Sequence, residues 1–183
     1  MLFPWLANVL DRGGKAVTKR PYTVPGLTNE DAKKVCEILQ DRLNSMNDLH
    51  LTLKHAHWNV VGPNFIGVHE MLDPQVETVR GFADAIAERI AALGSSPVGV
   101  PGRLTYQRPW EDYDVDRAGT IEHIKALNRV YDGVVKSHRD AIEETGEIDP
   151  VTEDMLTGQS FELEQFQWFL RAHLEDGSGK IDQ

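Results

Sequence analysis

The chain is short of cysteine and of long hydrophobic runs, and each shortage excludes a class of protein. Among its 183 residues Cys36 is the single cysteine, so an internal disulfide is excluded. Cys36 falls in a helical apolar pattern, where we interpret it as a small core residue. Residues 1–10 are apolar but follow no basic segment and show no evident cleavage site, which is not typical of a signal peptide. We therefore expect a cytoplasmic protein without a membrane segment.

Positive charge is also scarce. The sequence has 19 lysines and arginines against 29 aspartates and glutamates, a net charge of −10. This balance argues against a surface that attracts nucleic acid everywhere, and it favours the attraction of cations. Residues 1–26 are the exception, because they hold four basic residues and one acidic residue. The four basic residues are Arg12, Lys15, Lys19 and Arg20.

Length and composition predict one soluble domain with tails. A hydrophobic content of 40% and a charged content of 26% are ordinary for a globular protein, and the length suits a single core. We expect an N-terminal tail over residues 1–26, a helical domain over residues 27–175 and a short C-terminal tail over residues 176–183. The C-terminal tail is nearly without positive charge.

Four segments show the apolar spacing of amphipathic helices. Thr28 is a predicted N-cap for the first, which continues to His57, and Asn64 is a predicted cap for the second, which stops at Gly94. The third is predicted from about Asp116 to Gly146, and the fourth from Pro150 to Leu174. Residues 94–112 are too broken by proline for a long helix, and no strand pattern is found. The sequence therefore predicts an all-α, ferritin-like four-helix bundle with a long crossover connection between the second and third helices.

Two histidines and three carboxylates within 32 positions form the most informative group of side chains. Imidazole and carboxylate without thiolate suit a divalent first-row metal. Four of the five fall on one face of the second predicted helix, within an arc of about 100° that also carries apolar residues, where carboxylates without a partner are costly. The five residues are His57, His69, Asp73, Asp84 and Glu88.

The spacing of these residues indicates a site shared between two chains. Along the helix axis, Asp84 lies about 16 Å from the turn that carries His69 and Asp73, which is too far for one metal site. Two copies of this helix packed antiparallel about a two-fold axis would bring the two groups together twice. His57, at the end of the first helix, would complete the histidine side.

Other interpretations fit less well. A di-iron centre within one subunit uses Glu-x-x-His pairs, and no histidine in this sequence has a glutamate three places before it. A zinc hydrolase motif beginning at His69 and Glu70 fails, because Asp73 stands where the second histidine is required. A core histidine with solvated carboxylates, on a simple helical scaffold, remains the plain structural alternative, but it leaves the set as a whole unexplained.

The run HWNVVGPNFIGVHEMLD at residues 57–73 resembles the signature of the Dps family of miniferritins. The run FQWFLRAHLE at residues 166–175 resembles the last helix of that family. The similarity covers about residues 22–175 and is greatest to actinobacterial members. It implies a hollow shell of twelve subunits with ferroxidase sites at two-fold interfaces. By motif position, one subunit would supply His57, His69 and Asp73, and its partner Asp84 and Glu88.

The resemblance also implies an activity. Family members oxidise Fe(II), usually with hydrogen peroxide in preference to dioxygen, at sites that hold two irons, and store the Fe(III) mineral in the cavity. Zinc is an expected substitute for iron at such sites. Trp58 is expected to pack over the site or to quench radicals, with the filling of a subunit interface as the alternative. Asp114, Asp116 and Glu122 match the region of a three-fold pore through which iron enters, although acidic residues also favour a helix N-terminus through its dipole.

DNA is the less certain partner. Family members that compact DNA generally do so with basic tails, and the N-terminal basic residues, repeated over a shell, would bind phosphates with avidity. The apolar residues between 2 and 10 depart from a plain lysine-rich tail. Association with the nucleoid, and a non-catalytic DNA-compacting shell with structural metal sites, therefore stay open as alternatives.

Overall fold

The computed structural model describes residues 22–104, 113–175 and 180. Four long helices make up most of this part of the chain, as the periodicity predicted. They are α2 (Asn29–Asn59), α3 (Phe65–Ala92), α5 (Thr120–Gly146) and α6 (Pro150–Leu174). A short helix, α4 (Pro101–Leu104), and two short strands, β1 (Val60–Val61) and β2 (Ala118–Gly119), complete the description.

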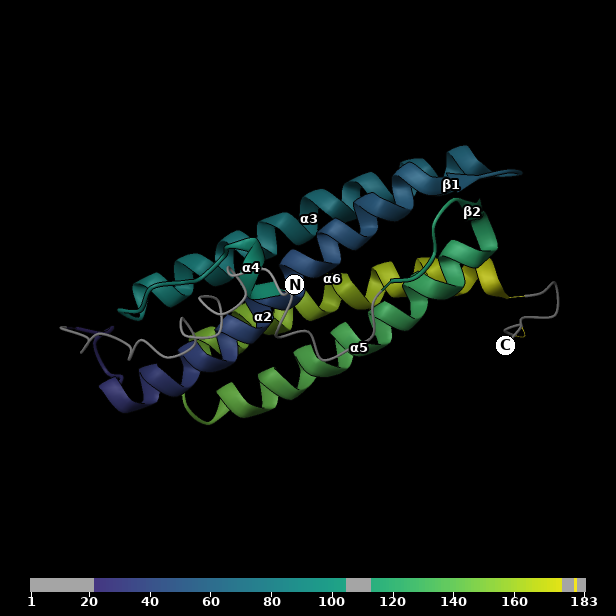
Figure 1. Ribbon diagram of the computed structural model, residues 1–183. Coiled ribbons are helices and arrows are strands. Elements are labelled where there is room, and N and C mark those ends of the chain that lie inside the picture. The colour runs from purple at the N-terminus through teal and green to yellow at the C-terminus, as the bar shows by residue number, and fades with distance from the viewer. Residues whose placement is uncertain (1–21, 105–112, 176–179, 181–183) are drawn as a thin grey trace, which may run out of the picture.

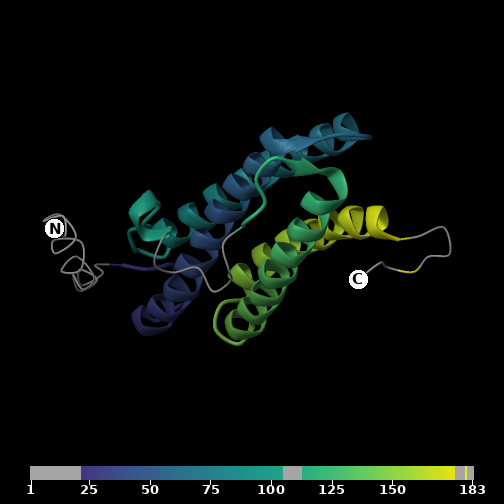
Figure 2. The same cartoon turned by 45° about the vertical axis from the view of Figure 1, so that its right-hand side comes forward.

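The four helices form two packed pairs. Helix α2 lies along α3, and α5 lies along α6 (Figures 1 and 2). Strand β1, which follows α2, pairs in parallel with β2, which precedes α5. Because α3 leads away from β1 and the chain returns to it at β2, the intervening connection runs the length of the bundle. The crossover between the second and third long helices is therefore confirmed.

Two expectations from the sequence were wrong at this connection. We found no strand pattern, yet Val60 pairs with Ala118 and Val61 with Gly119. Strands of two residues are too short for an alternating pattern, and their pairing joins positions far apart in the chain. The third long helix also begins at Thr120 rather than near Asp116, because Ala118 and Gly119 are extended in this pairing.

The helix ends follow local chemistry in part. The hydroxyl of Thr28 accepts a hydrogen bond of 3.1 Å from the backbone N–H of Asp31, so the predicted cap is confirmed. Asn64 stands at the predicted cap of α3 but has a left-handed backbone, with φ of 60°, and its side chain makes no capping bond. Gly94, with φ of 81°, is required after α3, because a Cβ atom there would lie 2.1 Å from the Tyr22 carbonyl oxygen.

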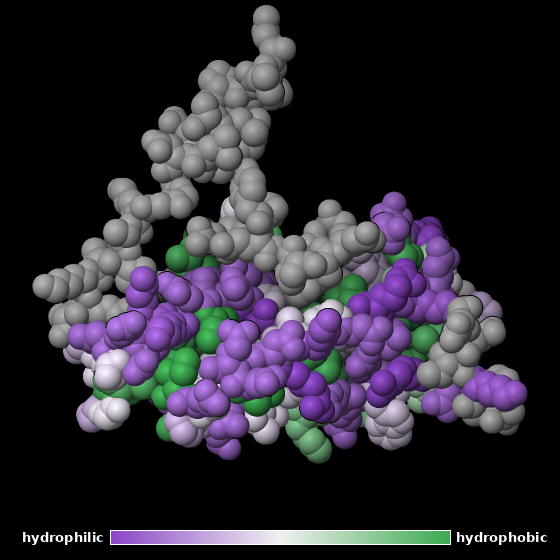
Figure 3. Space-filling view, turned by 90° about the horizontal axis from the view of Figure 1, so that it is seen from below, coloured by the Kyte–Doolittle hydropathy of each residue, from purple (hydrophilic) through white to green (hydrophobic). Residues whose placement is uncertain are grey.

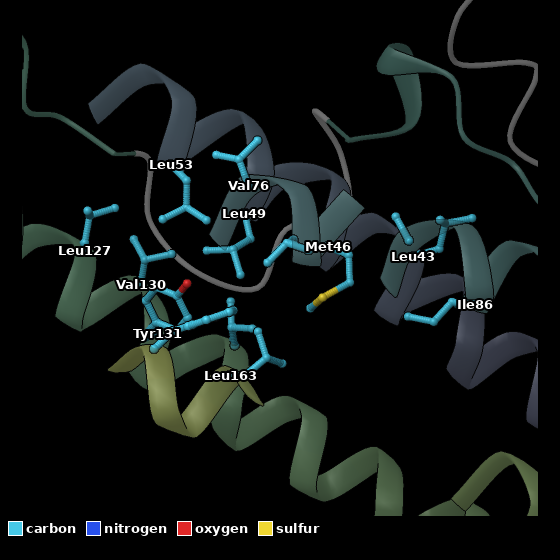
Figure 4. Packing of buried hydrophobic residues seen from close by; sticks show 14 of the residues in the cluster. Leu43, Met46, Leu49, Leu53, Val76, Ile86, Leu127, Val130, Tyr131 and Leu163 are labelled. Atoms are coloured by element: carbon cyan, nitrogen blue, oxygen red, sulfur yellow. The ribbon is translucent and has the colours of Figure 1, made fainter. Parts of the chain in front are cut away.

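The core lies between the two helix pairs (Figure 4). Side chains from all four long helices meet there, including Leu49 of α2, Ile86 of α3, Leu127 of α5 and Leu163 of α6. Tyr131 is wholly buried among them and donates a hydrogen bond of 2.8 Å to Gln75 Oε1. Cys36 is buried, as expected of a small core residue.

The outer surface is mixed. The face in Figure 3 is mainly hydrophilic, with smaller hydrophobic areas between the polar side chains. Among the described residues, no helix combines the length and apolar character needed to cross a bilayer. The exposed large hydrophobic side chains include Trp58 and Phe65 near the turn between α2 and α3.

Candidate metal centre

His57 and His69 are brought together by the turn between α2 and α3. Gly62, with φ of 89°, and Asn64 reverse the chain so that the end of α2 meets the start of α3. The two imidazole rings stack with centroids 3.6 Å apart and an interplanar angle of 22°. His57 is buried, as its place on the apolar face of α2 predicted, and His69 is half-buried.

Reciprocal hydrogen bonds orient this pair. His57 Nδ1 lies 2.9 Å from the backbone oxygen of His69, and His69 Nδ1 lies 2.9 Å from the backbone oxygen of His57. Since a carbonyl oxygen can only accept, each Nδ1 carries the hydrogen and donates it. In the neutral rings both Nε2 atoms therefore keep their lone pairs, which is the arrangement found in metal-binding histidines.

Asp73 lies one turn beyond His69 and joins the pair. Its Oδ1 is 2.7 Å from Lys54 Nζ and 3.3 Å from His57 Nδ1. The hydrogen bond from Lys54 is the main cause that lowers the pKa of Asp73, and the positive charge of Lys54 adds to it. Asp73 is thus an ionised carboxylate beside the two imidazoles.

Asp84 and Glu88 lie further along α3 and are exposed. Over residues 22–104 and 113–175, no group of three or more histidine, cysteine, aspartate or glutamate side chains is arranged to hold a metal ion. The expectation that these carboxylates occupy a buried apolar stripe was wrong for the single chain, because Asp73 is exposed as well. Side chains that face outward on one helix complete a site only if a second surface meets them.

Asp84 borders an open surface hollow of about 390 Å³ between α2, α3 and the crossover connection. His50 and Asn47 of α2 and Arg80 of α3 also line it. Trp58 is 70% exposed and does not cover the histidine pair within one chain, whereas the ring of Phe65 lies 5.3 Å from that of His69.

Sequence reasoning missed Lys54, although it makes the shortest polar contact to Asp73. The contact joins α2 to α3 across a separation of 19 residues, so it depends on how the two helices are aligned and leaves no local signal. Phe65 was not singled out from the sequence either.

The three acidic residues assigned to a pore lie at the start of α5. Asp114 and Asp116 are exposed in the segment that leads to β2, and Glu122 is exposed in the first turn of α5. They therefore share one end of the bundle with the turn that holds the histidine pair (Figure 1). The basic residues Arg12, Lys15, Lys19 and Arg20 lie outside the described residues, as does most of the segment 176–183.

Comparisons with known proteins identify the family. The family model described as a ferritin-like domain matches residues 36–179. A DNA protection during starvation protein of Mycolicibacterium smegmatis is 55% identical over 160 residues, which cover 87% of each chain. The solved Mycobacterium smegmatis Dps in its tetragonal form is 54% identical with a TM-score of 0.87, and covers 88% of this chain and 99% of its own. DpsA14 from Streptomyces coelicolor is 56% identical with a TM-score of 0.88, covering 92% and 100%. The chain therefore belongs to the Dps family of ferritin-like proteins.

Proposed function

We propose that this chain is the subunit of a shell that oxidises and stores iron. Its substrates are Fe(II) and hydrogen peroxide, with dioxygen as a slower oxidant, and twelve copies enclose the Fe(III) mineral. Removal of free Fe(II) and peroxide together protects DNA from oxidative damage. The proposed location is the cytoplasm.

The orientation of His57 and His69 is the observation that carries this proposal. Because each Nδ1 donates to a backbone oxygen, Nε2 of each imidazole is the nitrogen oriented to bind a cation without rearrangement. A histidine pair that served packing alone would gain nothing from having both Nε2 lone pairs left over. The ionised Asp73 beside the pair adds an oxygen ligand of the kind that Fe(II) accepts.

The remaining ligands are proposed to come from a second copy. Asp84 and Glu88 are exposed on the same helix but too far along it to reach His69 of their own chain. Antiparallel packing of two α3 helices about a two-fold axis would place them opposite the histidine pair of the partner. The exposed Trp58 and Phe65 would then be covered by the same contact.

The chemistry of the shared site follows from its ligands. Two Fe(II) ions held together give one electron each to hydrogen peroxide, which leaves as two hydroxide ions without releasing hydroxyl radical. The three carboxylates offset the positive charge that grows as iron is oxidised, and the imidazoles keep the first ion in place. Zinc would bind the same nitrogen and oxygen ligands without redox chemistry, so it would inhibit the site.

The acidic segment that leads into α5, residues 114–122, is proposed to supply the iron. Asp114, Asp116 and Glu122, repeated around a three-fold axis, would raise the local concentration of divalent cations. The same end of the bundle carries His57, so a cation attracted to these carboxylates would be near the proposed centre.

The test is peroxide oxidation of bound iron. Purified protein is loaded with Fe(II) without oxygen and mixed with substoichiometric hydrogen peroxide, and Fe(III) is followed by absorbance. We expect rapid oxidation into soluble protein, slowed by about tenfold or more in Asp84→Asn, because the partner side of the site loses a charged ligand. Asp154→Asn, which changes an exposed carboxylate on α6, is the matched control. Equal rates in native protein and Asp84→Asn would refute the shared centre.

A further inference from the structure

A group of ring side chains lies where the crossover connection meets α2 and α5. Tyr113 Oη is 2.7 Å from His123 Nδ1, and the two rings are stacked with centroids 6.1 Å apart. His55 packs its edge against the ring of Tyr113 at 5.7 Å. His123 is wholly buried and Tyr113 is half-buried. Neither the metal centre nor the acidic segment accounts for this arrangement.

Hydrogen bonds orient the rings in this group. His55 Nε2 lies 2.9 Å from the backbone oxygen of Val115 and must donate to it, which holds the ring beside Tyr113. Burial lowers the pKa of His123, so its ring is neutral at physiological pH. In the tautomer whose hydrogen is on Nε2, Nδ1 accepts from the hydroxyl of Tyr113.

Tyr113 cannot readily lose its proton to water. Burial raises the pKa of its phenol well above the usual range. A phenol gives up an electron easily only when its proton leaves at the same time, and a neutral imidazole at 2.7 Å is a base in position to take it. The geometry therefore suits proton-coupled oxidation.

We propose that Tyr113 captures one-electron oxidants formed when a single Fe(II) ion meets hydrogen peroxide, with His123 as the acceptor of the phenolic proton. This inference rests on the proposed function, which brings iron and peroxide to the molecule. Tyr113 is the residue before Asp114, and the charges of Asp114 and Glu122 act on its phenol. An iron ion drawn to these carboxylates is not yet paired, so peroxide would be reduced there by one electron at a time.

The steps balance. One Fe(II) reduces hydrogen peroxide to hydroxide and hydroxyl radical, and becomes Fe(III). The hydroxyl radical takes an electron from Tyr113 and becomes hydroxide, while the phenolic proton moves to His123 Nδ1. A second Fe(II) returns the electron to the tyrosyl radical, and His123 returns the proton. The sum is two Fe(II) and one peroxide converted to two Fe(III) and two hydroxides, which is the stoichiometry of the paired site.

Rapid-freeze electron paramagnetic resonance tests the proposal on the full-length assembled protein. The Fe(II)-loaded protein is mixed with hydrogen peroxide and frozen at successive times, and Fe(III) formation is followed in parallel. We expect a tyrosyl radical that is lost in Tyr113→Phe, together with more hydroxyl radical captured by an added spin trap. Tyr22→Phe removes a tyrosine that is 62% exposed and is the control that keeps the signal.

The outcomes separate this inference from the proposed function. A native protein that oxidises Fe(II) without a radical, or with a radical that persists in Tyr113→Phe, overturns the role of Tyr113 and leaves the ferroxidase proposal standing. If the native protein does not oxidise Fe(II), the ferroxidase proposal fails, and flash oxidation by a ruthenium photo-oxidant tests the pair directly. A Tyr113 radical that forms more slowly in D₂O, and more slowly in His123→Gln, supports proton transfer to His123. Equal rates overturn it.

Discussion

Lys54 places a positive charge against a carboxylate that the proposed centre uses. Its Nζ is 2.7 Å from Asp73 Oδ1, and its side chain is 31% exposed. A metal ion that binds to Asp73 therefore competes with an ammonium group already paired to it. Partial exposure makes this competition modest, because water screens the pair.

Replacement of Lys54 by glutamine should strengthen metal binding. We expect the affinity for Fe(II) or Zn(II) to rise by about threefold, the amount that corresponds to a partly exposed ion pair. Anaerobic isothermal titration calorimetry measures it. Lys33→Gln, which removes a cation paired with Glu37 on the same helix, is the control. An unchanged or weaker affinity in Lys54→Gln would show that Lys54 does not compete for Asp73.

His138 makes the free energy of unfolding depend on pH. Burial in α5, helped by the charge of Arg42, lowers the pKa of His138 to about 4, against an ordinary value of 6.5. Above pH 6.5 the ring is neutral in both states and has no effect. As the pH falls from 6.5 to about 4, His138 binds a proton in the unfolded chain but not in the folded chain. The free energy of unfolding therefore decreases.

This loss should amount to about 3 kcal/mol for each subunit across the window. Urea unfolding of the metal-free protein at several pH values measures it, and His138→Leu should flatten the slope. His173→Leu changes an exposed histidine of α6 and should keep the native slope. A slope that is the same in His138→Leu and in the native protein would contradict the assignment.

At the scale of helices, a buried ion pair joins the end of α3 to the start of α6. Arg89 Nη2 lies 2.6 Å from Asp149 Oδ2, and Thr152 Oγ1 donates to the same oxygen at 2.5 Å. Arg89 Nε also donates to Thr152 Oγ1 at 3.0 Å. Asp149 is thus held at the N-cap position of α6 by Arg89 of α3 and by Thr152 of α6 itself, and Pro150 follows as the first helical residue.

Replacement of Asp149 should lower the free energy of unfolding, and the size of this effect should depend on pH. Asp149→Ala leaves the half-buried guanidinium of Arg89 without its partner, which we expect to lower the free energy of unfolding by about 3 kcal/mol near neutral pH. Burial alone would raise the pKa of Asp149, but the bonds from Thr152 and Arg89 outweigh it and the pKa is lowered. The contribution is therefore present above the ordinary carboxyl pKa and is lost as the pH falls through the folded value.

Thermal or urea unfolding near neutral pH and in acid tests both parts of this prediction. The difference between native protein and Asp149→Ala should shrink in acid. Asp154→Ala, an exposed change on the same helix, should have little effect at either pH. A difference that stays constant with pH would show that the charge of Asp149 is not what joins the helices.

At the scale of the whole molecule, charge separates the tail from the body. The four basic residues between Arg12 and Arg20 precede a body whose balance is strongly acidic. In an assembled shell each subunit would add one such tail, so weak phosphate contacts would sum to binding by avidity. DNA binding through the tails, and with it association with the nucleoid, is therefore proposed together with the shell.

Neutralisation of the four basic tail residues should abolish DNA binding. We expect the assembled native protein to retard duplex DNA, with an affinity that falls steeply as salt is raised, because counterions are released on binding. Changing the four tail residues to glutamine should remove the retardation. The control changes four exposed basic residues of the body, Lys33, Lys34, Arg117 and Lys136, to glutamine. Retardation by the neutral-tail variant would assign DNA binding to another surface.

Much of the fold could be predicted because its signals are local. The Thr28 cap is set by a neighbouring backbone group, Gly94 takes the left-handed backbone that glycine favours after a helix, and the four helices follow from apolar spacing over a few turns. The start of α5 could not be predicted in the same way. Ala118 and Gly119 are extended only because they meet Val60 and Val61, more than fifty residues earlier in the chain.

The candidate site could likewise be predicted only in part. The ligand types and the separation of Asp84 from His69 along one helix were readable from the sequence, and they were enough to predict a site between two copies. The exposure of Asp73, Asp84 and Glu88 could not be predicted, because the apolar stripe of α3 borders its polar face. The helical spacing alone does not say on which side of that border a residue lies.

The amino-acid sequence by itself determined the four helices, their order and the residues able to bind a metal, because these depend on residue type and on contacts within a few turns. Only the tertiary structure decided that His57 and His69 orient each other through backbone oxygens, that Lys54 meets Asp73, and that Tyr113 meets His123. Each of those contacts joins two elements at one particular alignment. That alignment is set by the packing of the whole core, so no short stretch of the chain encodes it.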